Sequence, residues 1–93
     1  MNVRKIEVNE MKVAHFSKRD VLEDEGARVE RIHKLLKAVV LSHIEHQDVG
    51  IVIRLESNEL IETYCNLIDF AGDYVMIKGG TIIPLISIAE VEF

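Results

Sequence analysis

Apolar and polar residues alternate with a period of two over the second half of the chain, from residue 49 to residue 93. Short alternating runs are separated by turn-forming residues at 57–59, 71–73 and 79–80. The pattern predicts five short antiparallel strands. Strands this short leave exposed edges in an open sheet, so we expect them to close into a small barrel.

One set of alternating positions in this segment is predicted to face the barrel interior. The set is Ile51, Ile53, Leu55, Ile61, Thr63, Cys65, Leu67, Val75 and Ile77. The second strand, 60–70, is longer than its neighbours and is therefore expected to bend and to serve two sheets. Gly79 and Gly80 supply the positive φ of a tight turn, and Pro84 is expected at an edge or a strand end because it has no amide hydrogen.

The segment 17–48 is predicted to form one amphipathic helix followed by a polar connector. Ser17 or Asp20 can cap this helix, and its acidic residues come early and its basic residues late, as the helix dipole favours. Apolar residues at three- and four-residue spacing form one stripe, which is expected to pack on the barrel. The stripe consists of Val29, Ile32, Leu36, Val39 and Val40. The helix is expected to end near Leu41, and a strand over 38–46 is the alternative because β-branched residues cluster there.

The N-terminal residues 3–16 alternate only in part, because short apolar pairs are separated by charged side chains. This pattern predicts one or two strands, with a hairpin at residues 9–10, which lack the Asn-Gly or Asp-Gly signal of a two-residue turn. We therefore expect a single α+β domain of 93 residues. It consists of a strand arm at 1–16, a helix and connector at 17–48 and a five-stranded antiparallel barrel at 49–93.

Charge is distributed unevenly along the chain, whose formal net charge is −5. Residues 1–48 carry nine basic and nine acidic side chains, whereas residues 49–93 carry two basic and seven acidic ones. An acidic barrel repels a phosphate backbone, so nucleic acid is not the expected partner.

Composition indicates a folded protein of a reducing compartment. Hydrophobic residues make up 48% of the chain and charged residues 29%, and aliphatic side chains supply the core because there is no Trp. Cys65 is the only cysteine, so no intrachain disulfide can form. The charged N-terminus is unlike a signal peptide, and no apolar run approaches the roughly 20 residues of a membrane span. We expect a cytoplasmic protein of a bacterium or a similar cell.

The end of the chain resembles the end of an SH3-like barrel. Strand-like residues lead to Pro84, then to a stretch at 87–89 suited to one 3₁₀ turn, and then to a short last strand. The segment 61–85 is also similar to runs of the form "VET…LKGG…IPI" in uncharacterised small bacterial proteins. Both resemblances imply a fold and no particular activity.

A second resemblance is to Sm-like barrels. The segment 77–79, Ile-Lys-Gly, is similar to the Ile-Arg-Gly element of that family, in which a helix also precedes five strands. The resemblance implies the same small-barrel fold and, in that family, RNA binding. Asp73 stands here where the family carries the Asn that reads a base, which argues against RNA as the ligand.

Four basic residues are the candidate partner-binding set. Arg31, Lys34 and Lys37 are predicted to project from the helix opposite the apolar stripe, and Lys78 lies beside the Gly-Gly turn. Such a ridge, extended by Arg28, can hold phosphate or an acidic partner. Basic helix faces are more often simply solvated, so the ridge by itself does not define a ligand.

Two further groups have chemical potential but simpler structural explanations. His43 and His46 share a helix face with Glu45 between them, yet zinc needs three or four ligands, so a polar connector is expected. Cys65 is in phase with inward-facing residues and has no basic neighbour in the sequence, so a buried, unreactive thiol is expected. We predict no catalytic residue, metal ligand or cofactor.

These observations predict a non-catalytic small-barrel module that binds protein or assembles with itself. Self-association is expected through strand edges of the barrel and through the arm, whose strand partner then lies on a second copy. The alternatives are an Sm-like RNA-binding protein and, third, an enzyme or metal site built on His43 and His46. No small-molecule substrate and no membrane association are expected.

Overall fold

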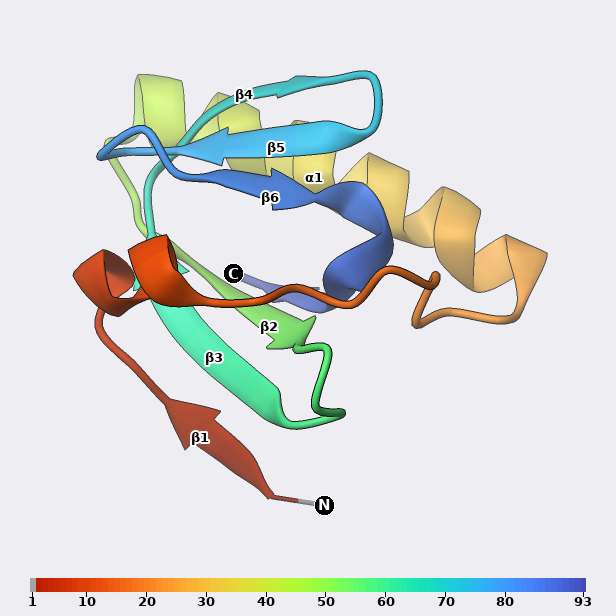
Figure 1. The fold of residues 1–93 in the computed structure, drawn as a ribbon. Helices are drawn as coiled ribbons and strands as arrows, with labels where there is room; N and C mark the ends of the chain where they lie inside the picture. The colour runs from red at the N-terminus through yellow and green to blue at the C-terminus, as the bar shows by residue number, and fades with distance from the viewer. Residues whose placement is uncertain (1) are drawn as a thin grey trace.

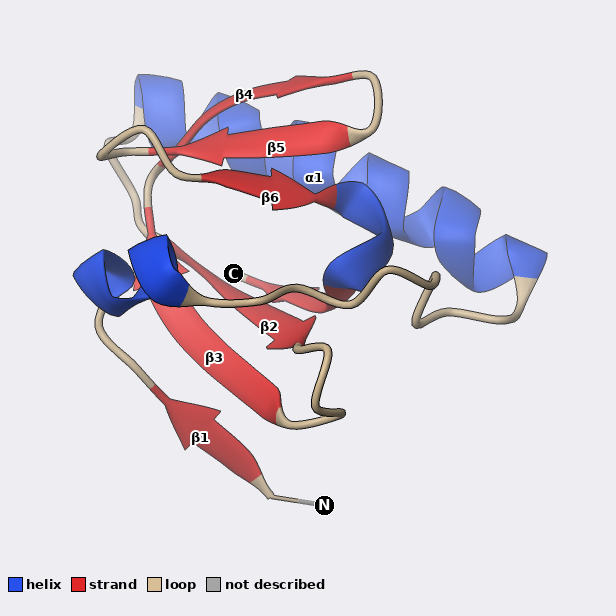
Figure 2. Ribbon diagram, viewed as in Figure 1, coloured by secondary structure: helices blue, strands red, loops and turns tan. Residues whose placement is uncertain are grey.

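The computed structural model describes residues 2–93 as one long helix and two β-sheets (Figures 1 and 2). The strands are β1 (Val3–Lys5), β2 (Val49–Arg54), β3 (Leu60–Cys65), β4 (Leu67–Ala71), β5 (Tyr74–Ile77), β6 (Ile82–Pro84) and β7 (Ile88–Glu92). The helix is α1 (Glu25–Ile44), and two 3₁₀ helices are η1 (Val8–Val13) and η2 (Leu85–Ser87). The sheets have the strand orders β1-β3-β2-β7 and β4-β5-β6, antiparallel except for β1 with β3.

The fold belongs to the predicted α+β class, but it contains no closed five-stranded barrel. Residues 49–93 form six strands, which are divided between the two sheets. The long second strand breaks at Asn66 into β3 and β4, so it serves both sheets, as its length predicted. Two hydrogen bonds hold the break: the amide of Leu67 donates to the side-chain Oγ of Ser42 (3.0 Å), and the amide of Lys78 donates to the carbonyl of Asn66 (2.9 Å).

The core lies between the two sheets. Its buried residues are Met11, Leu35, Ala38, Val49, Ile51, Ile53, Ile61, Cys65, Leu67, Val75, Ile77, Ile83, Ile88 and Val91. Most of the predicted inward positions are confirmed, and Leu55 is half-buried at the rim. In Figure 1 the helix α1 passes behind the three-stranded sheet, and it contacts β4 of that sheet and β7 of the other. It thereby bridges the two sheets on that side.

The N-terminal arm differs from the predicted hairpin. Its strand β1 pairs in parallel with β3 of the same chain, and the Arg4 guanidinium lies 2.6 Å from a carboxylate oxygen of Glu59. The following residues wind into η1, because apolar Val8 and Met11 are spaced by three, which suits a 3₁₀ turn better than a strand. This turn buries Met11 in the core. The partner of the arm therefore lies within the chain.

The segment that follows the arm crosses the opening between the sheets, in front of them in Figure 1. Phe16 forms an antiparallel bridge with Leu55, and the amide of Ser17 donates to the carbonyl of Arg54 (3.1 Å). Ser17 therefore does not cap the helix. Instead α1 begins at Glu25, because the carboxylate of Asp24 accepts a hydrogen bond from the amide of Ala27 (2.9 Å).

The predictions for the Gly-Gly turn and for Pro84 are confirmed. Gly79 and Gly80 have φ values of +105° and +92°, and Pro84 ends the edge strand β6. The 3₁₀ turn near the end of the chain is present, although it lies two residues earlier than predicted, at Leu85–Ser87. The helix runs past Leu41 to Ile44, so the alternative of a strand over 38–46 is wrong.

Candidate functional site: the two faces of helix α1

The helix α1 presents to the core the face that was predicted to be solvated. Its buried residues are Arg31, Leu35, Ala38 and Ser42, which lie four, three and four positions apart and therefore share one face. The predicted core stripe faces outward, apart from the half-buried Val39. The assignment of this stripe to the core was wrong.

The buried face can hold Arg31 because both terminal nitrogens of the guanidinium donate charge-assisted hydrogen bonds, although the buried Nε has no partner. Its Nη1 and Nη2 atoms donate to Oδ1 and Oδ2 of Asp20, each at 2.9 Å. Nη1 also donates to the carbonyl of Ile88 (3.1 Å), a backbone acceptor on β7. Arg31 therefore fastens both the segment before the helix and the outer edge of β7 to α1.

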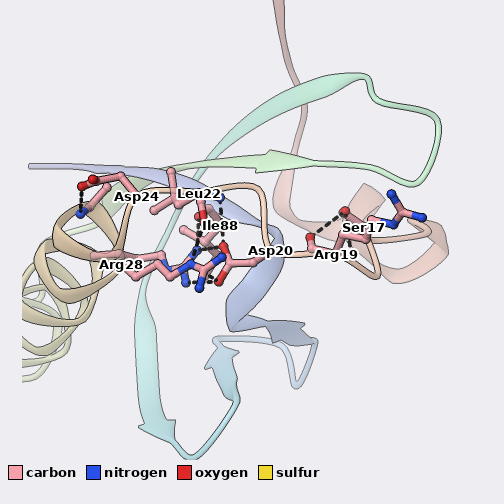
Figure 3. Close-up of polar contacts among 9 residues, drawn as sticks. Ser17, Arg19, Asp20, Leu22, Asp24, Arg28 and Ile88 are labelled. Atoms are coloured by element: carbon pink, nitrogen blue, oxygen red, sulfur yellow. Dashed lines mark hydrogen bonds and ion pairs between the residues drawn. The ribbon is translucent and has the colours of Figure 1, made fainter.

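Asp20 is the centre of this cluster (Figure 3). Besides the bonds from Arg31, its Oδ1 accepts the amide of Leu22 (2.9 Å), and its Oδ2 lies 3.3 Å from Nε of Arg28. Burial alone would raise the pKa of Asp20, but the hydrogen bonds from Arg31 and Leu22 and the charges of both arginines outweigh it. The pKa is therefore held below its ordinary value. The prediction that Asp20 caps the helix is wrong, because its carboxylate is bonded to Arg31 and Leu22.

The hydroxyl of Ser42, the second polar residue of the buried face, makes two hydrogen bonds. Its hydroxyl donates to the carbonyl of Gln47 (3.2 Å) and accepts the amide of Leu67 (3.0 Å). The backbone carbonyl of Ser42 accepts the side-chain amide of Asn66 (3.2 Å). This residue therefore ties the last turns of α1 to the point where the chain passes from β3 to β4.

The predicted basic set is not assembled into one site. Arg31 is buried in the Asp20 cluster and is unavailable to an external ligand. Lys34 is half-buried, and Lys37 places its Nζ 4.8 Å from the centroid of the Phe93 ring, a cation–π distance. Lys78 is exposed in the turn between β5 and β6. No hydrophobic signal in the sequence distinguished Arg31 from the three lysines.

The outward face of α1 is apolar over most of its length. We define the α1 apolar face as Val29, Ile32, Leu36, Val40 and Ile44. These side chains are between 37% and 72% exposed. Its C-terminal end adjoins β4, since Nε2 of His43 lies 2.7 Å from the carbonyl oxygen of Ile68, whose side chain is also exposed. The last turn of α1 therefore lies beside β4, an edge strand of the three-stranded sheet.

A smaller apolar surface lies on the outer face of the three-stranded sheet. Met76 and Ile82 are cross-strand neighbours on β5 and β6, and together with Tyr74 they are exposed. They line a shallow hollow of about 100 Å³ with Asp69 and Ala71. Three such side chains present less apolar surface than the five of the α1 apolar face.

The remaining candidates have structural roles. His43 contacts the Ile68 carbonyl, and His46, with φ +53°, lies just beyond the C-cap of α1. Within residues 2–93 no three His, Cys, Asp or Glu side chains gather so that they could hold a metal ion. Burial, with a smaller contribution from the charge of Asp48, raises the pKa of the Cys65 thiol to about 12, so no thiolate forms at neutral pH.

The outer face of the four-stranded sheet carries an acidic pair. Glu62 on β3 is buried, and its charge, followed by burial, raises the pKa of Glu92 on β7. Lys5 and Lys34 offset this effect in part. The pair destabilises the folded state at neutral pH, since two carboxylates repel each other.

Comparison with protein-family models, with curated proteins and with solved structures finds no match for this chain. In the described part of the chain, no helix is both long and apolar enough to cross a membrane.

Proposed function

We propose that this chain is a non-catalytic module that acts by binding protein, and that the α1 apolar face is its working surface. One observation carries the proposal: the helix leaves five large aliphatic side chains exposed while it buries an arginine and a serine on its opposite face. The largest contiguous apolar patch on a protein surface is often a binding site.

The spacing of the exposed side chains fits recognition of a helix by a groove. Ile32, Leu36 and Val40 follow Val29 by three, seven and eleven positions, which places them on one side of α1. Burying an aliphatic side chain completely contributes about 1.5–3 kcal/mol, and roughly half of that remains available at each of these positions. A partner that covers all five can therefore gain about 4–7 kcal/mol from this face alone.

We further propose that the two sheets form a small barrel of the SH3-like or Sm-like kind, left open where α1 and the segment after the arm lie across it. The order of elements supports this: a helix, then β2, then a bent pair β3–β4, then β5 and β6, a 3₁₀ turn, and β7. A fold of this kind does not determine its ligand. No observation favours RNA, because residues 49–93 are acidic and Arg31 is withdrawn from the surface.

Photo-cross-linking tests the proposal in the cell. A photoreactive amino acid at Leu36, in the middle of the α1 apolar face, is expected to form discrete covalent adducts with protein. The same amino acid at Ser57, which is exposed in the turn after β2 and lies outside that face, is the control and should give few adducts. If position 36 forms no more adducts than position 57, the α1 apolar face is not a binding surface and the proposal fails.

A further inference from the structure

We infer that the groove between α1 and the outer edge of β7 binds a short extended segment of a partner protein, which pairs with the backbone of Val91 as an added strand. The inference goes beyond the proposed function, because it concerns a second surface, on the flank of α1, and a different kind of contact. Backbone pairing gives the affinity at such an edge, and side-chain contacts give the specificity.

The backbone of Val91 is not paired with β2. In an antiparallel ladder, residue pairs that exchange hydrogen bonds alternate with pairs whose backbone groups point to the outer edges. The amide of Ile6 donates to the carbonyl of Glu62 (2.9 Å) on the β1 side of β3, so Glu62 does not bond its opposite residue Val52. Val52 therefore bonds Glu90 on β7, and the next residue, Val91, points its N–H and C=O away from β2.

The same outer edge of β7 is already used at Ile88, whose carbonyl accepts a hydrogen bond from Nη1 of Arg31 (3.1 Å). Val91 has no such partner. Neither its N–H nor its C=O bonds another group within residues 2–93, although the residue is only 2% exposed. Buried backbone groups of folded proteins are nearly always paired. These two groups therefore call for a donor and an acceptor that the chain does not supply.

A hollow of about 220 Å³ borders this part of the edge. The helix lines it with Ala27, Glu30, Arg31 and Lys34, and β7 lines it with residues 89–91. Successive side chains of a strand point to opposite faces, so a hollow that meets three consecutive residues borders the edge of the strand. The buried Nε of Arg31 also has no partner. Two donors and one acceptor beside this hollow are thus unpaired.

These unpaired groups fit a peptide backbone. The N–H and C=O of one edge residue pair with the C=O and N–H of one residue of an added strand, and Nε of Arg31 supplies a further donor. A second hollow of about 220 Å³ shares Glu30 and Lys34 with the first and reaches Phe93, so the groove follows β7. Each hollow is smaller than the roughly 300–1,000 Å³ that encloses a drug-sized ligand, which favours a narrow extended segment.

The two ends of the groove differ in charge. Glu30 and Glu90 line the first hollow, whereas His33 and Lys37 line only the second, and Lys34 lies between the two ends. We therefore expect the bound segment to carry a basic side chain beside the first hollow and an acidic one beside the second.

NMR couplings across hydrogen bonds test the pairing of β7 in the free protein. The amides of Glu90 and Glu92 should couple to the carbonyls of Val52 and Gly50, which lie opposite them. The amide of Val91 should show no such coupling. A coupling from the Val91 amide to any carbonyl of the chain overturns the inference.

Binding is measured with N-acetyl-alanine N-methylamide, a blocked single residue that carries both backbone groups. It should shift the signals of the Val91 amide and of Arg31 Nε–H saturably, with a dissociation constant on the order of 10 mM, as expected for so small a ligand. The same compound methylated on the alanine nitrogen lacks the donor for the Val91 carbonyl. It should bind about tenfold more weakly.

A substitution that fills the hollow is the second test. Ala27→Leu should abolish these shifts, whereas Glu25→Leu adds the same side chain at an exposed position outside the hollow and should leave them unchanged. Equal binding of the two compounds, or shifts that survive Ala27→Leu, overturns the inference. An absence of shifts also overturns it and shows that water alone fills the hollow. The amides of Ile32 and Leu36 should not respond, so every outcome leaves the proposed function standing.

Discussion

On one face of α1, Arg31 and Ser42 are buried beside Leu35, and on the other face Leu36 and Val40 are about half exposed. The two faces differ in what holds them. The buried polar groups have fixed partners in Asp20, the Ile88 carbonyl and the Leu67 amide, whereas the exposed aliphatic groups have none within the described chain. Specific hydrogen bonds therefore determine which face of this helix is turned inward, and the more hydrophobic face is not the one that is buried.

The largest expected effect concerns the buried face. Arg31→Met removes the cation and leaves the Asp20 carboxylate partly buried without its main partner, which is expected to destabilise the fold by about 3–5 kcal/mol. Thermal denaturation measures this cost. The double variant Arg31→Met with Asp20→Leu should recover a large part of it, because no unpaired charge remains. A single variant as stable as the wild type would show that Arg31 is not buried against Asp20.

A smaller cost is expected at Ser42. Ser42→Ala leaves the Leu67 amide without its acceptor at the junction of β3 and β4, which should cost about 1–3 kcal/mol in the free energy of unfolding. Urea denaturation gives the value, and Ser57→Ala, in the exposed turn after β2, is the control and should have little effect. Equal effects of the two substitutions would contradict the hydrogen bond to Leu67.

The turns and most inward strand positions were predictable because their signals are local. Glycines at positive φ, a proline at the end of a strand and alternation within five or six residues depend on neighbours in the sequence. The orientation of α1 was not predictable in this way. Periodicity identified the stripe that contains Leu36, but it does not say whether a stripe faces the core or a partner. That choice depends on contacts of Arg31 and Ser42 with residues 11 to 57 positions away.

The same distinction explains the candidate site. Four residues of the α1 apolar face, Val29, Ile32, Leu36 and Val40, were predicted as part of one stripe, and their assignment to the core was wrong. The fifth, Ile44, was missed because the helix was expected to end near Leu41. Arg31 was grouped with Lys34 and Lys37 because all three are basic and lie on the side away from the stripe. The pairing with Asp20 spans 11 residues, and no spacing rule for helices connects them, since Asp20 lies before the helix.

Acid denaturation tests the contribution of the Asp20 carboxylate to stability. The pKa of Asp20 is lowered in the folded state, so its contribution to stability is present above its ordinary value of about 4 and is lost as the pH falls through the folded value. Asp20→Asn should be less stable at neutral pH and should lose less additional stability between about pH 4 and pH 2. Arg4 also lowers the pKa of Glu59, and this affects the pH dependence of stability equally in the wild type and in Asp20→Asn. Parallel stability curves for the two proteins would contradict the role of Asp20.

The smallest expected effect lies on the outer face of the four-stranded sheet. The pKa of Glu92 is raised by the charge of Glu62, so ionisation of Glu92 destabilises the fold at neutral pH and this cost disappears as the pH falls. Glu92→Gln should raise the melting temperature by about 1–3 °C at pH 7. Near pH 4 the two proteins should melt together. A lower melting temperature for Glu92→Gln at pH 7 would exclude repulsion between Glu62 and Glu92.

The orientation of α1 is tested most directly by placing the same charge at two adjacent positions. Leu35 is 0% exposed and Leu36 is 51% exposed. Leu35→Asp buries an unpaired carboxylate, whose cost of several kcal/mol is comparable with the whole stability of about 5–15 kcal/mol, so this variant should be unfolded or should melt far below the wild type. Leu36→Asp should melt within a few degrees of the wild type when both are monomeric. The reverse result, an unfolded Leu36→Asp and a stable Leu35→Asp, would contradict the account.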